Sequence, residues 1–167
     1  MFCQNWDISR ARDFDRLQER ASPEAIARAA VASASRSVAF TYNDPVIFHE
    51  YAIDVAKACA EYDIKSVAVT AGYIQPEARK RFFSHMDAAN VDLKSMDDGF
   101  YRKVCKGRLQ PVLDSLTGMR AAGIWLELTN LLIPGLNDDM ALVRRMAEWV
   151  RRELGAGTPL HFSRFQP

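Results

Sequence analysis

The sequence predicts a single α/β domain in which parallel strands alternate with helices. Short runs rich in β-branched and apolar residues are separated by longer segments whose apolar residues repeat at helical spacing. Such short runs are typical of strands buried on both faces of a parallel sheet. An open or partial (β/α) barrel and a doubly wound sheet both fit this order, because about five strands are too few for a closed eight-stranded barrel.

Five segments are expected to form the strands, with helices between them. In chain order the strands are Ser37–Tyr42, Ser66–Thr70, Ala88–Lys94, Ile124–Ile133 and Leu160–Phe165. A strand, a helix and another strand in succession predict parallel βαβ units with right-handed crossovers. The 167 residues, 49% of them hydrophobic, are enough for one sizeable domain with a packed core and too few for two ordinary ones.

The helices are expected where capping residues and proline precede apolar residues at helical spacing. Ser22–Glu24 supplies an N-cap, a proline and an acidic first turn for a helix that runs to about Ser33. Asp44-Pro45 repeats this signal before Phe48–Cys59, whose apolar stripe predicts that Cys59 is buried. Further helices are expected from Pro76 to Phe83, at Tyr101, over Leu109–Ala121 and, capped by Asp138, over Met140–Leu154.

Polar and turn residues gather where each expected strand ends. In both architectures ligands bind beyond the carboxyl ends of the strands, so this edge is the expected site. Asp92 and Lys94 share one face of a strand, because side chains alternate with a period of two. A carboxylate and an ammonium at this edge can together hold a zwitterion such as an amino acid. The alternative for Asp92 and Lys94 is a purely structural ion pair. For the polar residues at the other strand ends, the alternative is helix capping and turn formation.

Composition excludes several other classes of function. The net charge of +1 predicts no general attraction to nucleic acid or to an anionic membrane. No apolar run approaches the roughly 20 residues that span a bilayer, and no secretory leader is expected. The three cysteines are widely spaced and do not indicate a disulfide framework, so a reducing, cytoplasmic location is expected. Neither glycine-rich nucleotide-binding signature is present.

Several separated blocks of the sequence resemble a known family. Phe2–Trp6 (FCQNW) is similar to the end of the Cys-x-x-x-Cys-x-x-Cys loop of radical S-adenosylmethionine (SAM) enzymes, in the form found in pyruvate formate-lyase activating enzymes. Over essentially its whole length the chain resembles the radical SAM member of the AmmeMemoRadiSam system. The blocks that carry this resemblance are FCQNWDIS, AFTYNDPVIFHEY, VAVTAGYI, DAANVDLKSM, FYRKVCKG, PVLDSL, WLELTNLLIPGLNDD and PLHFSRFQP.

The resemblance implies a partial (β/α) barrel of the radical SAM type and two cofactors. In this family three thiolates hold a [4Fe–4S] cluster, and Cys3 would be the third of them. The reduced cluster cleaves SAM to methionine and a 5′-deoxyadenosyl radical, which abstracts hydrogen from a substrate. The implied partners are an electron donor such as flavodoxin or ferredoxin and an unknown protein or small-molecule substrate, as in glycyl-radical activases. No nucleic acid or membrane partner is expected.

The resemblance also implies which residues contact SAM at the strand ends. They are Asn43 and Asp44 near the SAM amino group, Thr70 and Gly72 in a turn beside SAM, Asp92 and Lys94 along the site, and Pro134 close to the adenine and ribose. Glu127 and Asn130 are weaker candidates. The chain departs from the family at Asp44, where glutamate is usual, and at Ala71, where an amide side chain is usual.

The start of the sequence departs furthest from the family. Only two residues precede Cys3, whereas the family has two further cysteines and a strand before this position. We therefore expect residues 1–167 to be a single radical SAM core domain that is truncated at its N-terminus, without the first strand and most of the cysteine loop. Such a chain alone is expected to form no stable cluster. A non-catalytic fragment with at most a binding role, and an unrelated aldolase-like barrel with Lys94 as the Schiff-base lysine, are the alternatives.

Overall fold

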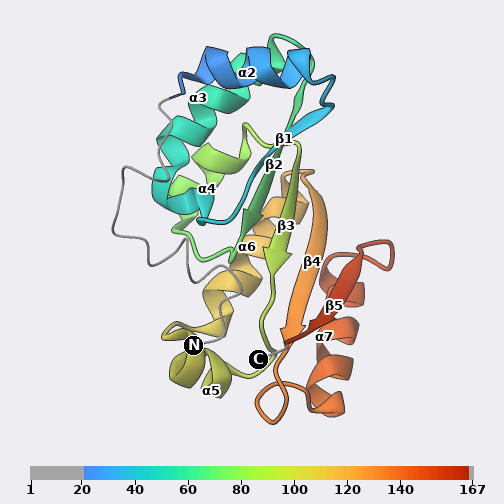
Figure 1. The fold of residues 1–167 in the computed structure, drawn as a ribbon. Helices are drawn as coiled ribbons and strands as arrows, with labels where there is room; N and C mark the ends of the chain where they lie inside the picture. Colours follow the sequence, from blue (N-terminus) through green and yellow to red (C-terminus); the bar gives the residue numbers. More distant parts are fainter. Residues whose placement is uncertain (1–20, 166–167) are drawn as a thin grey trace.

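A computed structural model describes residues 21–165, whose strands form one parallel sheet (Figure 1). The five strands lie in the order β1-β2-β3-β4-β5, so each pairs with its neighbours in sequence. They are β1 Ser37–Phe40, β2 Lys65–Thr70, β3 Ala88–Asp92, β4 Trp125–Leu132 and β5 Leu160–Arg164. A doubly wound sheet reverses its strand order at a switch point, and this sheet does not. The structure therefore confirms the α/β class and favours the partial barrel.

Helices lie where the sequence pattern predicts them, and the short helix expected at Tyr101 consists of two elements, α5 and η3. They are α2 Pro23–Ala32, the 3₁₀ turn η2 Pro45–Phe48, α3 His49–Ala60, α4 Pro76–Phe83, α5 Asp98–Phe100, the π-helical turn η3 Tyr101–Cys105, α6 Leu109–Ala121 and α7 Met140–Glu153. Ser22 caps α2 as expected, since its hydroxyl accepts a hydrogen bond from the Ala25 N–H. Among the described residues no helix is both long and apolar enough to cross a membrane.

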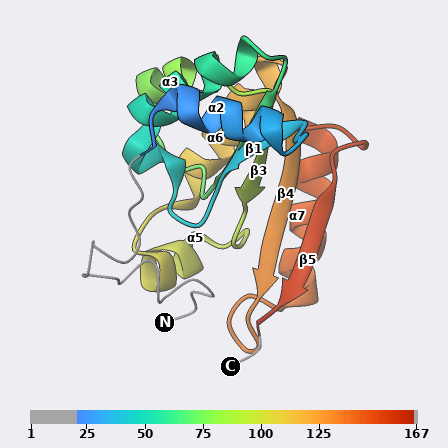
Figure 2. The same ribbon diagram turned by 45° about the horizontal axis from the view of Figure 1, so that its top comes forward.

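The sheet has one covered face and one open face. In Figures 1 and 2 helices α6 and α7 lie behind the sheet, and in Figure 1 no described helix crosses in front of β3 and β4. Burial alternates accordingly along β4, where Leu126 and Leu128 are buried and Glu127 and Thr129 are only half-buried. The buried residues pack against the helices and form the core, which includes Cys59 as expected.

Two strand ends and one helix cap differ from those expected, beside shifts of a single residue at the bounds of β2, β4 and β5. The first strand ends at Phe40 instead of Tyr42, because Tyr42 has a left-handed backbone with φ of 70°. The third strand ends at Asp92, before Lys94. The cap of α7 is Asp139, whose side chain accepts a hydrogen bond from the Ala141 N–H. The assignment of this cap to Asp138 was therefore wrong.

Candidate functional site

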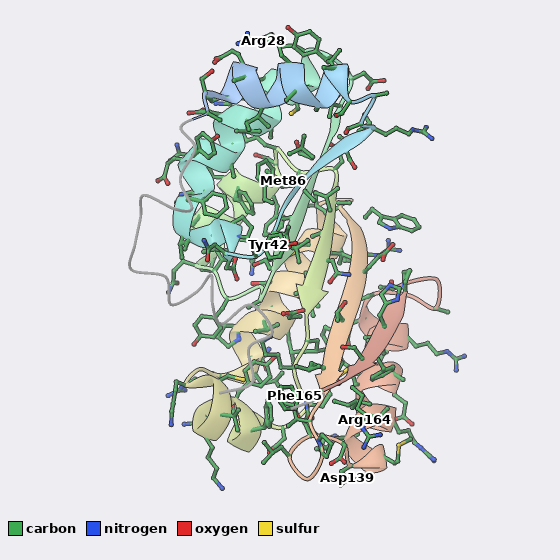
Figure 3. The ribbon with its side chains drawn as sticks, in the orientation of Figure 1. Arg28, Tyr42, Met86, Asp139, Arg164 and Phe165 are labelled. Atoms are coloured by element: carbon green, nitrogen blue, oxygen red, sulfur yellow. The ribbon has the colours of Figure 1, made fainter. Side chains whose placement is uncertain are left out.

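The candidate site lies at the carboxyl edge of the sheet, where the loops after the strands converge. Figure 3 labels Tyr42 just after β1 and Phe165 just after β5 at this edge, and Met86, which precedes β3, at the opposite, amino edge. Two groups of side chains stand out here. One joins the loop after β1 to the end of β2, and the other surrounds the end of β3.

The carboxylate of Asp44 ties the loop after β1 to the end of β2. Its Oδ1 accepts hydrogen bonds from the Thr70 hydroxyl at 2.8 Å and from the Val46 N–H at 3.1 Å. Its Oδ2 accepts one from the Ala71 N–H at 2.9 Å. The Thr70 hydroxyl in turn accepts a bond from the Gly72 N–H at 3.0 Å. Three of the expected site residues thus form one connected network.

The turn after β2 requires glycine at position 72. Gly72 has φ of 68°, in the left-handed region that favours glycine, and it is buried. A Cβ at this position would lie 2.9 Å from Cγ1 of Val91 on β3. Close packing therefore fixes the turn against the neighbouring strand.

The end of β3 carries an ion pair beside a cavity. Lys94 Nζ donates a hydrogen bond to Asp92 Oδ2 at 2.9 Å, and both side chains are about two-fifths exposed. A cavity of about 260 Å³ adjoins the pair, and its lining also includes Ala71, Tyr101 and Cys105. The pair therefore offers both signs of charge to a ligand that enters this cavity.

Two other expected site residues lie apart from this cavity. Asn43 and Pro134 are exposed on the loops after β1 and β4, outside the cavity lining. The structure therefore joins Asp44, Thr70 and Gly72 in one group and Asp92 and Lys94 in another. Asn43 and Pro134 belong to neither group and lie on the loops after β1 and β4.

A match of residues 1–147 to the radical SAM superfamily decides the family. The chain belongs to the radical SAM superfamily.

Two relatives of known sequence match most or all of the chain. The chain is 38% identical over 167 residues to the uncharacterized protein MJ0808 of Methanocaldococcus jannaschii, covering all of this chain and 49% of that one. It is 25% identical over 114 residues to the pyruvate formate-lyase-activating enzyme of Clostridium pasteurianum, covering 68% of this chain and 48% of that one. The chain thus spans about half the length of these two relatives.

Solved structures of radical SAM proteins share the fold. A domain of the pyruvate-formate lyase-activating enzyme from Bacteroides vulgatus matches with a TM-score of 0.64 at 23% identity, covering 73% of this chain and 74% of that one. Streptococcus suis SuiB bound to S-adenosylmethionine matches with a TM-score of 0.71 at 11% identity, covering 90% of this chain and 36% of that one. The partial radical SAM fold expected from the sequence is thereby confirmed.

Sequence reasoning gave no role to two residues that line the cavity of this radical SAM domain. Tyr101 was expected only as part of a short helix, and Cys105 had no expected function. Both belong to η3, and the signal for them was the block FYRKVCKG within the resemblance. Burial raises the pKa of the Tyr101 hydroxyl. Burial also raises the pKa of the Cys105 thiol, against the opposing effect of the Lys94 ammonium.

The weaker candidates Glu127 and Asn130 lie on opposite faces of β4. Glu127 faces the open side, where its Oε2 lies 2.9 Å from His161 Nε2. This hydrogen bond lowers the pKa of the Glu127 carboxyl. Asn130 is 1% exposed and its Nδ2 donates to the Leu93 carbonyl at 2.6 Å, while no partner is present for its Oδ1 among the described residues. Asn130 therefore supports the backbone after β3.

The described residues contain no cluster ligands. Within residues 21–165 no group of three or more His, Cys, Asp or Glu side chains is placed to hold a metal ion. Cys59 is buried in the core and Cys105 lines the cavity. Cys3, the expected cluster ligand, lies outside the described residues. No step through a cluster can be derived from these side chains.

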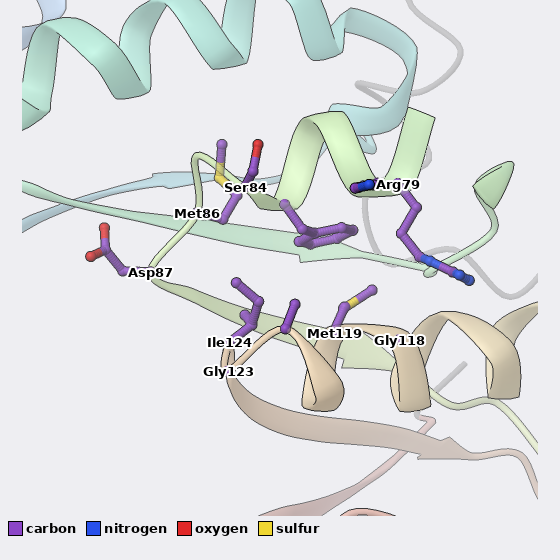
Figure 4. A pocket seen from close by; sticks show the side chains of 11 residues that line it. Arg79, Ser84, Met86, Asp87, Gly118, Met119, Gly123 and Ile124 are labelled. Carbon is purple, nitrogen blue, oxygen red and sulfur yellow. The ribbon is translucent and has the colours of Figure 1, made fainter. Parts of the chain in front are cut away.

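A second, larger hollow lies far from the ion pair. Figure 4 shows this groove of about 670 Å³ between α4 and α6, with Asp87 and Ile124 beside the starts of β3 and β4. It therefore opens at the amino edge of the sheet. Its place makes it a poor candidate for the SAM site of a parallel α/β fold.

Proposed function

We propose that the protein containing this chain is a radical SAM enzyme that binds SAM with Asp92 and Lys94. The observation that carries the proposal is the 2.9 Å ion pair beside a cavity at the carboxyl edge of a radical SAM domain. The cofactors that the family implies are SAM and a [4Fe–4S] cluster, to which Cys3 would contribute one ligand and which would supply the electron for cleaving SAM, so that hydrogen could be abstracted from a substrate.

The charges of the pair suit the two ends of the amino-acid part of SAM. The Lys94 ammonium would bind the SAM carboxylate, and the Asp92 carboxylate would accept hydrogen bonds from the SAM amino group. These two residues already contact each other, so each keeps a partner when SAM is absent. Asn43 and Pro134 lie on the flanking loops and would contact SAM from either side. Such a frame orients SAM and excludes water from it.

Asp44, Thr70 and Gly72 shape the SAM site from the side of β2. Because both Asp44 oxygens accept hydrogen bonds from Thr70, Ala71 and Val46, the carboxylate mainly orders the two loops. Remaining lone pairs leave room for one further bond to the SAM amino group. The proposed role of Asp44 is thus to hold the loop in place first and to contact SAM second.

The reaction is proposed to be like that of glycyl-radical activases. Relatives named as activating enzymes support this, including those for pyruvate formate-lyase and for 4-hydroxyphenylacetate decarboxylase. We further propose membership of the AmmeMemoRadiSam system, a cytoplasmic location, and an electron donor such as flavodoxin or ferredoxin. The substrate is a protein or a small molecule.

The test is SAM cleavage by the protein that contains this chain, after anaerobic reconstitution with iron and sulfide. We expect SAM-dependent formation of 5′-deoxyadenosine under reducing conditions. Asp92→Ala removes a charged hydrogen bond worth about 1.5–3 kcal/mol and should weaken SAM binding about ten- to a hundred-fold. The matched control is Asp54→Ala, which breaks the exposed Asp54–Lys57 pair (3.7 Å) on α3 and should leave binding unchanged.

Two results would count against the proposal. An unchanged dissociation constant for SAM in Asp92→Ala would remove Asp92 from the site. SAM binding without any 5′-deoxyadenosine would instead favour the alternative of a non-catalytic protein with a binding role.

A further inference from the structure

The backbone of Leu93 and Lys94 leaves the sheet, yet it is held firmly. Pairing between β3 and β4 ends at Asp92 and Thr129, so within residues 21–165 the next two residues pair with no strand. Leu93 is fully buried and Lys94 is half-buried. Buried backbone groups need hydrogen-bond partners, and here side chains from three different segments supply them.

Each of these partners comes from a different place in the fold. Asn130 of β4 donates to the Leu93 carbonyl at 2.6 Å. The Tyr101 hydroxyl of η3 accepts a hydrogen bond from the Lys94 N–H at 3.1 Å. Asn137, on the loop between β4 and α7, donates through Nδ2 to the Lys94 carbonyl at 2.7 Å.

Asn137 makes two further hydrogen bonds, both to the backbone at the end of β4 and in the loop after it. Its Nδ2 also donates to the Leu131 carbonyl at 2.9 Å, and its Oδ1 accepts from the Ile133 N–H at 2.7 Å. Ile133 directly precedes Pro134. The Asn137 side chain is 3% exposed, so no water competes for these bonds. One buried amide thus fastens Lys94 to the loop that carries Pro134.

The chemistry of this position requires an amide. Two carbonyl oxygens face Nδ2 and one N–H faces Oδ1, which fixes the orientation of the group. Aspartate would direct a carboxylate oxygen at the two carbonyls of Lys94 and Leu131, and serine would reach none of the three partners in the same way.

We propose that Asn137 is a positioning residue that sets the separation between Lys94 and the Pro134 loop. The inference rests on the proposed function, in which Lys94 binds the amino-acid end of SAM and the Pro134 loop lies at its nucleoside end. A ligand that reaches both places gains from their fixed separation, because binding at one end presents the other end at high effective concentration. Loosening the link removes this gain and leaves each separate contact intact.

The test compares SAM with its two halves, methionine and 5′-methylthioadenosine, on the reconstituted protein that contains this chain. In Asn137→Asp and Asn137→Ser we expect SAM binding to weaken at least about tenfold. Binding of each half alone should change less than about threefold, since neither half needs the fixed separation. Asn137→Ser adds no charge, so it answers the question if Asn137→Asp does not fold.

Two matched variants separate positioning from loss of stability. Asp139→Ala removes the cap of α7 on the same loop and costs about 1 kcal/mol of stability, but it should leave all three affinities unchanged. Tyr101→Phe releases the Lys94 N–H alone, so it should weaken SAM and methionine by the same factor and spare 5′-methylthioadenosine.

Each outcome decides the matter. Suppose that Asn137→Ser weakens the binding of SAM, methionine and 5′-methylthioadenosine by the same factor, and that Asp139→Ala does the same. Asn137 would then have a merely structural role, and the inference would be overturned. Unchanged SAM binding in Asn137→Ser would overturn it as well. Failure of the unaltered protein to bind SAM at all would contradict the proposed function instead.

Discussion

Substituting Gly72 by alanine should destabilise the protein strongly. Alanine in the left-handed conformation of this residue costs about 1–2 kcal/mol. The added Cβ would lie 2.9 Å from Val91 Cγ1, and the nearby Val112 and Ser115 leave little room for adjustment. Overpacking of this kind costs about 1–3 kcal/mol. The two effects sum to about 2–5 kcal/mol, which corresponds to about 4–20 °C in the melting temperature.

Gly123→Ala is the matched control for Gly72→Ala. Gly123 has φ of 79°, and a Cβ there would meet no atom within 4 Å. Both variants therefore carry the backbone strain, and only Gly72→Ala carries the clash with Val91. In thermal and urea unfolding, the free energy of unfolding of Gly72→Ala should be about 1–3 kcal/mol lower than that of Gly123→Ala. Equal stabilities would refute the close packing of this turn against β3.

Three further predictions concern charged and nucleophilic groups. Asp44→Asn turns an amide donor toward the donors that now bind the carboxylate, such as the Thr70 hydroxyl, and should cost about 1–3 kcal/mol in urea unfolding; unaltered stability would contradict this. The hydrogen bond from His161 lowers the pKa of the Glu127 carboxyl below its ordinary value. The ionised carboxylate therefore adds a small amount to the stability of the folded protein at neutral pH, and this amount is lost as the pH falls through the lowered pKa. Glu127→Gln should remove this contribution from the dependence of the melting temperature on pH. If the variant and the unaltered protein gave the same pH profile, Glu127 would make no such contribution. Burial raises the pKa of the Cys105 thiol, so iodoacetamide should label it slowly at pH 7 and faster at higher pH. Peptide mass spectrometry should show that SAM slows this labelling. A labelling rate that does not change with SAM would show that Cys105 lies outside the site.

The sequence predicted the alternation of strands and helices and the placing of Asp92 and Lys94 on one face, because both follow from local patterns, whereas the order of the strands in the sheet came from the structure. Alternation of apolar runs with helical segments predicts βαβ units, and a two-residue period puts both charges on one face. The end of β3 was missed because it depends on distant side chains. The Tyr101 hydroxyl takes the Lys94 N–H and Asn137 takes its carbonyl, and neither contact leaves a periodic trace in the sequence.

The cap of α7 shows the same limit on a shorter scale. Asp138 and Asp139 are adjacent and chemically identical, so capping preferences cannot choose between them. The structure decides through the preceding loop, in which Asp138 accepts a hydrogen bond from the Gly135 N–H at 2.9 Å. Asp139 is then left to bind the Ala141 N–H at 2.8 Å. The choice depends on the turn that brings Gly135 back toward Asp138.

The two positions at which the resemblance implies other residues, Asp44 and Ala71, contact each other in the structure. The resemblance implies a glutamate at position 44 and an amide side chain at position 71, where this chain has Asp44 and Ala71. In the structure the shorter carboxylate lies 2.9 Å from the backbone N of Ala71 and 2.8 Å from the Thr70 hydroxyl. A main-chain donor needs no side chain, so alanine at position 71 costs this contact nothing. The sequence presents these positions as two separate departures, whereas in the structure a hydrogen bond from the Ala71 backbone to the Asp44 carboxylate joins them.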